Sequence, residues 1–139
     1  QTSGLADCKL AQAIMANESS GRSGIISPVG AVGLMQVMPD TARGLDPGNL
    51  SGLTNAQITQ KLINDPEYNM QLGTQYIQQL SNQFNGDPAL IAAAYNGGPR
   101  ANNTSSTCGG GTWWQCSANS GYAETRVYVP RVLSTYNKL

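Results

Sequence analysis

Without a cofactor, any catalysis by this chain must use carboxylates, hydroxyls, amides, aromatic side chains or its three lysines. The sequence contains no histidine, which excludes Ser-His-Asp and Cys-His nucleophilic systems and histidine-ligated metal sites. Three cysteines cannot make a four-thiolate metal site, and neither a Walker-type phosphate loop nor a dinucleotide-binding fingerprint is present. The residues therefore imply no metal and no organic cofactor. Only three glutamates are available for catalysis, and these are Glu18, Glu67 and Glu124.

Glu18 has the position that best suits a general acid. A run of apolar residues at helical spacing ends at Asn17-Glu18, and a Ser/Gly-rich loop follows. The negative end of the helix dipole disfavours an ionised carboxyl there, and apolar neighbours such as Ile14 and Met35 would raise the pKa further. A raised pKa lets a carboxyl protonate a leaving oxygen near neutral pH. Position alone also fits an ordinary solvated glutamate, and Glu67 is most simply a first-turn helix acid.

The elements that must position these side chains are helices joined by loops rich in Gly, Pro, Ser and Asn. Apolar spacing and helix-start signals predict a series of helical segments. They are a helix ending near residue 18, one or two short pieces within 34–43 interrupted at Pro39, a helix over 54–63 capped by Thr54, a helix begun by Asp65-Pro66 and ending before residue 85, a helix begun by Asp87-Pro88, and a helix over 123–139.

For two of these helices we predict which residues form the buried face. The first helix is assigned the stripe Leu5, Cys8, Ala11, Gln12, Ile14 and Met15, and the last is assigned Val127, Val132, Leu133 and Tyr136. Pro130 is expected to kink or divide the last helix, because proline removes a backbone donor. No two-residue hairpin signal joins convincing strands. The predicted fold class is all-α, in one domain over residues 1–139.

Short motifs occur in a characteristic order along nearly the whole chain. They are Glu18-Ser19, Ser27-Pro28-Val29-Gly30-Ala31, Gly33-Leu34-Met35-Gln36, Pro39-Asp40-Thr41-Ala42, Pro66 and Asn69, Gly73 and Tyr76, Ala93-Ala94-Tyr95-Asn96-Gly97-Gly98-Pro99, Glu124-Thr125-Arg126 and Tyr128-Val129. This ordered set resembles the lytic transglycosylase family with the soluble-lytic-transglycosylase, lysozyme-like fold. The resemblance implies short helices around a substrate groove.

The resemblance also implies roles for individual residues. Glu18 matches the single catalytic acid of the family. The positions that match substrate-site residues are Ser27, Met35, Gln36, Tyr95, Asn96, Glu124 and Tyr128. Met35 at helical spacing would otherwise be read as a core residue, and Tyr95 as packing beneath the last helix. Arg126 is expected to be structural or solvated.

The family resemblance implies a mechanism in which one carboxyl acts twice. Glu18 protonates the oxygen between N-acetylmuramic acid and N-acetylglucosamine in peptidoglycan, and then deprotonates the C6 hydroxyl, leaving a 1,6-anhydro end. Hydrolysis, as in goose-type lysozymes, is the nearest alternative and normally needs a second acid, for which Asp40 and Asp46 are candidates. A second alternative is a weakly active peptidoglycan-binding assembly component, which Glu18→Gln would distinguish.

Three features depart from the family pattern. Ser20 stands where the family often has a large or aromatic residue, which would leave that side of the cleft more open. Gly98 replaces a common alanine. The segment from Arg100 to Gly121 contains no motif that aligns, and its Trp113 and Trp114 could stack on sugars or anchor the loop.

The three cysteines permit three single pairings. We favour a disulfide between Cys108 and Cys116, which would staple a turn-rich loop in an oxidising compartment, with Cys8 left over. Three free thiols in a cytoplasmic protein remain the alternative.

Composition indicates where the chain would act. Eight basic and eight acidic side chains cancel, so no attraction to nucleic acid or to an anionic membrane is expected. The longest apolar run, Leu90 to Tyr95, is too short to span a bilayer. A start at Gln1 fits a processed product. We expect a monomer in the periplasm or secreted, and family and size suggest service to a secretion, conjugation or pilus machine.

Overall fold

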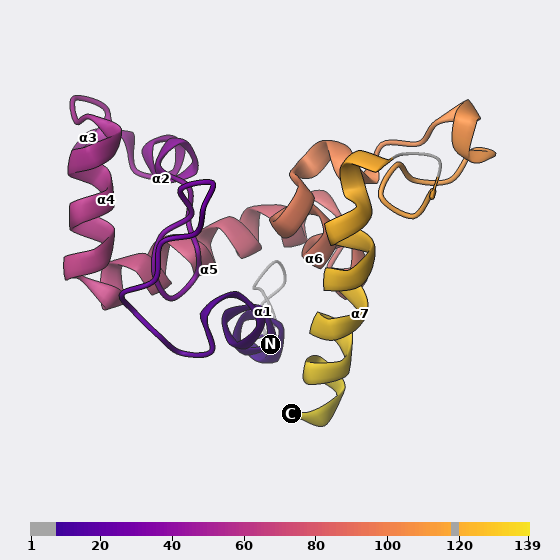
Figure 1. The fold of residues 1–139 in the computed structure, drawn as a ribbon, viewed down its shortest axis with the longest axis horizontal. Coiled ribbons are helices and arrows are strands. Elements are labelled where there is room, and N and C mark those ends of the chain that lie inside the picture. The colour runs from indigo at the N-terminus through magenta and orange to yellow at the C-terminus, as the bar shows by residue number, and fades with distance from the viewer. Residues whose placement is uncertain (1–7, 118–119) are drawn as a thin grey trace. The chain divides into compact units, whose positions relative to one another are not determined.

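The computed structural model describes residues 8–117 and 120–139 as helices and loops (Figure 1). The α-helices are α1 (Cys8–Ser19), α2 (Pro39–Leu45), α3 (Pro47–Leu50), α4 (Asn55–Asn64), α5 (Pro66–Gln83), α6 (Pro88–Gly97) and α7 (Ala123–Lys138). The 3-10 helices are η1 (Pro99–Asn102), η2 (Ser106–Cys108) and η3 (Ser120–Tyr122). Backbone pairing within the described residues is limited to isolated bridges, which confirms the all-α prediction.

The chain divides into two compact units. Unit 1 comprises residues 1–13 and 77–139, and unit 2 comprises residues 14–76. Helices α1 and α5 contribute residues to both units. The prediction of one domain over the whole chain therefore remains a prediction.

Helix starts follow the signals in the sequence. Thr54 caps α4 through a reciprocal pair: its Oγ1 accepts a hydrogen bond from the Gln57 backbone N–H (3.2 Å), and its own N–H donates to Gln57 Oε1 (2.9 Å). The Asp87 carboxylate accepts from the backbone N–H groups of Ala89 and Leu90 at the start of α6. Both predicted starts are confirmed.

The prediction for residues 34–43 was wrong in one respect. Pro39 does not interrupt a helix but begins α2, because its missing N–H and fixed φ suit the first helical position. The residues before it form a turn between short bridges that pair Val32 with Ile26 and with Val37. Gly33 and Gln36 adopt positive φ angles of 75° and 50° in this turn, which a helix cannot contain.

Pro130 does not divide the last helix. Helix α7 runs unbroken from Ala123 to Lys138. Pro130 lies on its exposed side, where water can replace the lost hydrogen bond, and Tyr128, Val129 and Val132 hold the helix against the core.

The two predicted stripes were also partly wrong. In α1, Leu5 lies outside the described residues and Cys8 and Gln12 are exposed. Ile14 is buried as predicted, and the other buried apolar residues are Leu10 and Ala13. In α7, Val127 is 59% exposed, whereas Val132 is buried as predicted. Apolar residues recur at overlapping helical spacings in both segments, so spacing alone does not identify the buried face.

Each unit has its own apolar core. The fully buried side chains of unit 2 include Ile14, Val32, Met35, Leu50, Ile58, Leu62 and Leu72. Those of unit 1 include Leu10, Ile77, Leu80, Ile91, Val129 and Val132, and α6 and α7 lie side by side there (Figure 1). None of the helices in the described part of the chain combines the length and apolarity needed to cross a bilayer.

Candidate active site

Glu18 lies in unit 2 at the C-terminal end of α1, as the next-to-last residue of the helix, and is half-buried. The carbonyls around it are satisfied locally. Ser20 N–H donates to Ala16 O (3.1 Å), and the backbone N–H and Nε of Arg22 both donate to Ser19 O (3.1 and 3.2 Å). Ser20, the residue that departs from the family pattern, adopts a positive φ of 54°. These bonds fix the turn that follows Glu18, so its backbone is held firmly.

Ser27 and Gln36 both belong to the turn-rich segment of unit 2 that follows α1. Ser27 Oγ accepts from Ala31 N–H at 3.0 Å, and Gln36 Nε2 donates to the carbonyls of Ile25 (3.2 Å) and Gly33 (3.0 Å). The structure therefore brings these two predicted residues into one hydrogen-bonded segment. In the conformation described, their polar groups close this segment on itself.

Met35 belongs to the core beneath that segment. Its side chain is only 1% exposed, and it packs where a side chain on Gly73 of α5 would otherwise lie, since a Cβ at Gly73 would be 2.6 Å from Met35 Cγ. The family position of Gly73 thus has a packing reason. The burial of Met35 favours the core reading that its helical spacing had left open.

Asn69 is a buried polar residue to which the sequence analysis gave no role. It is fully buried on α5, where its Oδ1 accepts from Met35 N–H (2.9 Å) and its Nδ2 donates to Val32 O (2.7 Å). One amide therefore fixes both ends of the Val32–Met35 turn. A polar residue one turn before Leu72, within an apolar helix face, was the signal that could have identified it.

Asn96 and Glu124 meet in unit 1, on α6 and α7. Asn96 Nδ2 donates to Glu124 Oε2 (3.0 Å), and Thr125 Oγ1 donates to Asn96 Oδ1 (2.8 Å). Gly97 allows the approach, because a Cβ there would lie 2.9 Å from Thr125 Oγ1. Thr125, buried and without a predicted role, thus orients the amide of Asn96 toward the carboxylate.

The other two predicted residues of unit 1 differ in exposure. Tyr95 is half-buried on α6, whereas Tyr128 on α7 is only 3% exposed. After α6 the chain turns at Gly98, whose φ is 87°. Glycine adopts that angle without the strain that a side chain would cause, so the residue type suits this turn.

Asp40 and Asp46, the candidate second acids, are both engaged in local contacts of unit 2. Asp40 pairs with Arg43 one turn along α2 (2.6 Å) and is 83% exposed. Asp46 Oδ2 accepts from the Tyr68 hydroxyl at 2.6 Å, and Asn49 Nδ2 donates to the same carboxylate. The hydrogen bonds from Tyr68 and Asn49 lower the pKa of Asp46. Burial, followed by the bond to Asp46, raises the pKa of Tyr68.

A pocket of about 470 Å³ opens beside this pair. Its lining residues are Asn49, Gln60, Lys61, Asn64, Asp65 and Tyr68. It contains none of the predicted site residues, so we do not equate it with the site. No group of three His, Cys, Asp or Glu side chains within residues 8–117 and 120–139 is placed to hold a metal ion.

The segment after α6 is closed by a disulfide. Cys108 and Cys116 are bonded, with their Cα atoms 5.4 Å apart, and Cys8 is a free, exposed thiol, so the favoured pairing is confirmed. Trp114 is only 7% exposed, and its Nε1 donates to Asn102 Oδ1 at 3.0 Å. Trp114 therefore anchors the loop. For Trp113 the alternatives of sugar stacking and loop anchoring stay open at this point.

The family follows from comparison with known sequences. Residues 4–108 match the sequence profile of the transglycosylase SLT domain. The chain belongs to this family. The match ends at Cys108, before the two tryptophans, Glu124 and Tyr128.

Particular relatives extend the similarity toward the C-terminus. The chain is 35% identical over 134 residues to the soluble lytic murein transglycosylase of Escherichia coli K12, covering 89% of this chain and 19% of the relative. The transglycosylase of Enterobacteria phage PRD1 is 36% identical over 92 residues, which cover 66% of this chain and 29% of the relative.

Two solved structures share the fold. The soluble lytic transglycosylase SLT70 of Escherichia coli superposes with a TM-score of 0.72 at 34% identity, covering 97% of this chain and 22% of that one. The second is the lytic transglycosylase Slt of Pseudomonas aeruginosa, in an inactive mutant with glutamine in place of a glutamate. It superposes with a TM-score of 0.68 at 35% identity, covering 94% of this chain and 21% of that one. The chain thus spans about a fifth of the length of these relatives.

Proposed function

We propose that this chain is a catalytic domain that cleaves the β-1,4 bond between N-acetylmuramic acid and N-acetylglucosamine in peptidoglycan, without water, leaving 1,6-anhydromuramic ends. The observation that carries the proposal is the family domain over residues 4–108. We assign the role of catalytic acid to Glu18, which lies at a hydrogen-bonded helix end. The relative made inactive by exchanging one glutamate for glutamine supports a mechanism in which one glutamate is essential.

In this mechanism Glu18 acts first as acid and then as base. It protonates the bridging oxygen while positive charge develops at C1 of the muramic residue, and the N-acetyl group of that sugar stabilises the charge. The ionised Glu18 then takes the proton of the C6 hydroxyl, whose oxygen attacks C1. One carboxyl suffices because the substrate supplies the second nucleophilic group.

The remaining predicted residues divide into contact and support. We assign substrate contact to Ser27, Gln36, Tyr95, Asn96 and Glu124. The side chains of Met35 and Tyr128 are buried, so we assign them the support of the surfaces above them.

Hydrolysis is the less favoured alternative. It would normally need a second carboxylate to activate a water molecule. Both candidate second acids are engaged with other partners. Asp40 forms an ion pair with Arg43, and Asp46 accepts hydrogen bonds from Tyr68 and Asn49. These contacts support the lyase reaction.

The test is mass spectrometry of the soluble products released from peptidoglycan sacculi. Wild type is expected to release anhydro-muropeptides, and Glu18→Gln none, while Glu67→Gln should match wild type because Glu67 is an exposed first-turn acid of α5. Products with reducing ends would show that the reaction is hydrolysis and would overturn the lyase proposal. Normal cleavage by Glu18→Gln would remove Glu18 from its role, and sacculus binding without cleavage by wild type would favour a binding component.

We further propose that the chain acts in the cell envelope, where a disulfide is stable and peptidoglycan is found. Local wall opening for a secretion, conjugation or pilus machine is the finer form of this proposal. Cell fractionation tests the location, and co-purification with an envelope machine tests the partner.

A further inference from the structure

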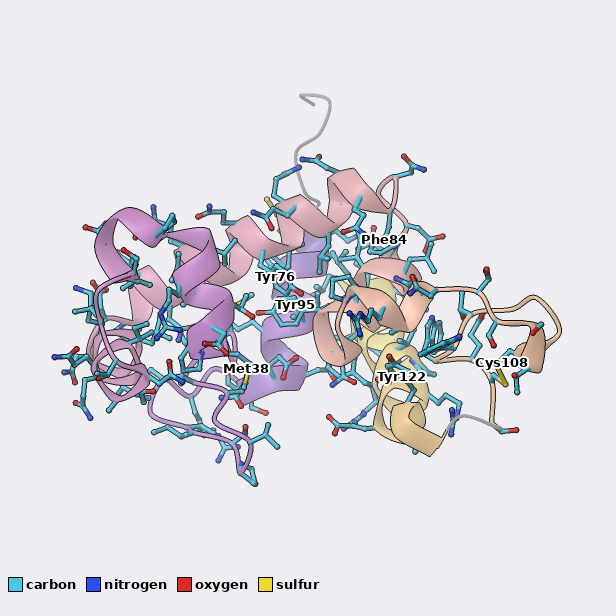
Figure 2. The ribbon with its side chains drawn as sticks, turned by 90° about the horizontal axis from the view of Figure 1, so that it is seen from above. Met38, Tyr76, Phe84, Tyr95, Cys108 and Tyr122 are labelled. Atoms are coloured by element: carbon cyan, nitrogen blue, oxygen red, sulfur yellow. A yellow bond between two sulfur atoms is a disulfide. The ribbon has the colours of Figure 1, made fainter. Side chains whose placement is uncertain are left out.

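The loop closed by the disulfide presents one tryptophan and buries the other. Trp113 is 36% exposed, whereas its neighbour Trp114 is 7% exposed. The indole of Trp113 faces Tyr122, with ring centroids 6.4 Å apart and planes tilted by 57°. Figure 2 labels Tyr122 and Cys108 in this part of unit 1. Trp113 and Tyr122 together form what we call the aromatic pair.

Several bonds hold the aromatic pair in place. Trp113 N–H donates to Asn103 O (2.9 Å), and the disulfide between Cys108 and Cys116 closes the loop a few residues away. Arg126 of α7 donates through Nη1 to the carbonyls of Trp114 (3.3 Å) and Cys116 (2.9 Å). The surface is thus attached to α7 and is not a loosely tethered loop.

The aromatic pair is continuous with the polar cluster of Asn96 and Glu124. Tyr122 is the residue before the first turn of α7, two positions ahead of Glu124. A Cβ on Gly97 would lie 3.2 Å from Tyr122 Cδ1, so the tyrosine ring packs directly against the chain that follows Asn96. Ring faces therefore border the hydrogen-bonding groups to which we assigned substrate contact.

The polar atoms of the aromatic pair are available to a ligand. The indole N–H of Trp114 is bonded to Asn102, but that of Trp113 and the hydroxyl of Tyr122 have no hydrogen-bond partner among the described residues. Exposed aromatic rings with polar edges suit sugars, because a ring face accepts the C–H face of a pyranose while the edge donates to hydroxyl or acetamido oxygens.

We propose that Trp113 and Tyr122 form a saccharide-binding surface for an N-acetylated sugar of the glycan strand, next to the sugar that contacts Asn96 and Glu124. The proposal rests on the proposed function for the identity of the glycan. The matched family profile ends at Cys108, so this surface lies beyond the part of the chain that the profile describes. This surface would contribute to binding and positioning of the glycan strand and would take no part in bond cleavage.

The experiment uses the two tryptophans as reporters. The chain has only two indole N–H groups, and Trp113→Phe assigns their NMR signals by removing one. We expect titration of the Glu18→Gln protein with the N-acetylglucosamine tetramer, which carries no peptide, to shift the Trp113 signal and leave that of Trp114 nearly unchanged. Trp113→Ala should weaken binding about fivefold to tenfold, with partial recovery in Trp113→Phe. Val127→Ala, which alters another exposed apolar side chain of unit 1, is the matched control.

An unmoved Trp113 signal at saturation, or equal affinity in Trp113→Ala and wild type, would overturn the proposal. A shift seen only with peptide-bearing muropeptides would also overturn it, in favour of a surface for stem peptides. Because the titration measures binding without cleavage, its failure is separate from the failure of catalysis by Glu18. Reduction of the disulfide is expected to weaken tetramer binding severalfold, and unchanged affinity would remove the loop's positioning role.

Discussion

At the scale of single residues, buried polar side chains organise the surfaces that we assign to the substrate. Asn69 holds the Val32–Met35 turn, and Thr125 orients Asn96 toward Glu124. Neither residue is expected to touch the reacting sugars. Their effect is to supply hydrogen bonds to backbone and amide groups in the interior, where the loss of a hydrogen bond is costly.

Asn69→Ala is expected to destabilise the protein by about 1–3 kcal/mol, because it removes the hydrogen bonds of Asn69 to Met35 N–H and to the Val32 carbonyl, of which the carbonyl keeps its bond from Val37 N–H. Urea unfolding measures the change. Gln71→Ala on the exposed side of the same helix is the control and should have little effect. Equal stability of the two variants would mean that water replaces the buried amide.

Tyr68→Phe is expected to reduce the amount of folding stability that the protein loses as the pH falls into the acid range. The pKa of Asp46 is lowered in the folded state, so its contribution is fully present above the unfolded-state value of about 3.9 and is lost as pH falls through the folded-state pKa. The variant should therefore be less stable than wild type at neutral pH, and the difference should shrink below about pH 4.

Urea midpoints measured across this range test the prediction for Tyr68. In an Asp46→Asn background the effect of Tyr68→Phe should be smaller, since the charged acceptor is gone. A difference that stays constant from neutral to acid pH would show that Tyr68 acts by packing alone.

At the scale of elements, helix starts were predictable and buried faces were not. Thr54 and Asp87 correctly predicted the starts of α4 and α6, because capping is a local interaction between residues close in sequence. The placement of Glu18 at the end of a helix and the Cys108–Cys116 pairing were also predictable from the sequence. The turn over 33–36 was not, because positive φ angles and the Asn69 bonds depend on contacts more than thirty residues apart.

The role of Trp113 shows the same limit. Two adjacent tryptophans are equivalent in sequence, and tertiary contacts distinguish the buried one. Trp114 donates its backbone N–H to Ala101 O and its indole N–H to Asn102 Oδ1. The burial of Met35 depends likewise on Gly73 of a distant helix.

Thr54→Ala is expected to destabilise α4 by about 1 kcal/mol, because the capping Oγ1 is lost and Gln57 N–H then has no side-chain acceptor. Thr54→Ser keeps the hydroxyl and should stay close to wild type. Thermal unfolding followed by circular dichroism measures both variants. Equal losses in Ala and Ser would attribute the effect to the methyl group and not to the cap.

At the scale of the whole molecule, two compact units share two helices. Unfolding of unit 2 alone would leave residues 8–13 of α1 and 77–83 of α5 as short helical remnants. Such pieces are well below the length of roughly 12–15 residues at which isolated helices become even marginally stable. The units should therefore unfold together.

Native-state hydrogen exchange tests this cooperativity. Asn69→Ala lies in unit 2, yet it should lower the protection of the slowest amides of both units by the same free energy. Gln71→Ala again serves as the control. Loss of protection confined to residues 14–76 would show that the units unfold independently.

The contacts of Asn96 also affect how the molecule ages. Asparagine before glycine deamidates readily, because the unhindered glycine nitrogen can attack the side-chain carbonyl. Asn96-Gly97 is such a pair, but it lies in the last turn of α6 with its carbonyl bonded to Thr125, whereas Asn85-Gly86 lies exposed in the turn after α5. Folding thus protects the amide whose conversion would place a second negative charge beside Glu124, and partial unfolding during storage would expose it to irreversible loss.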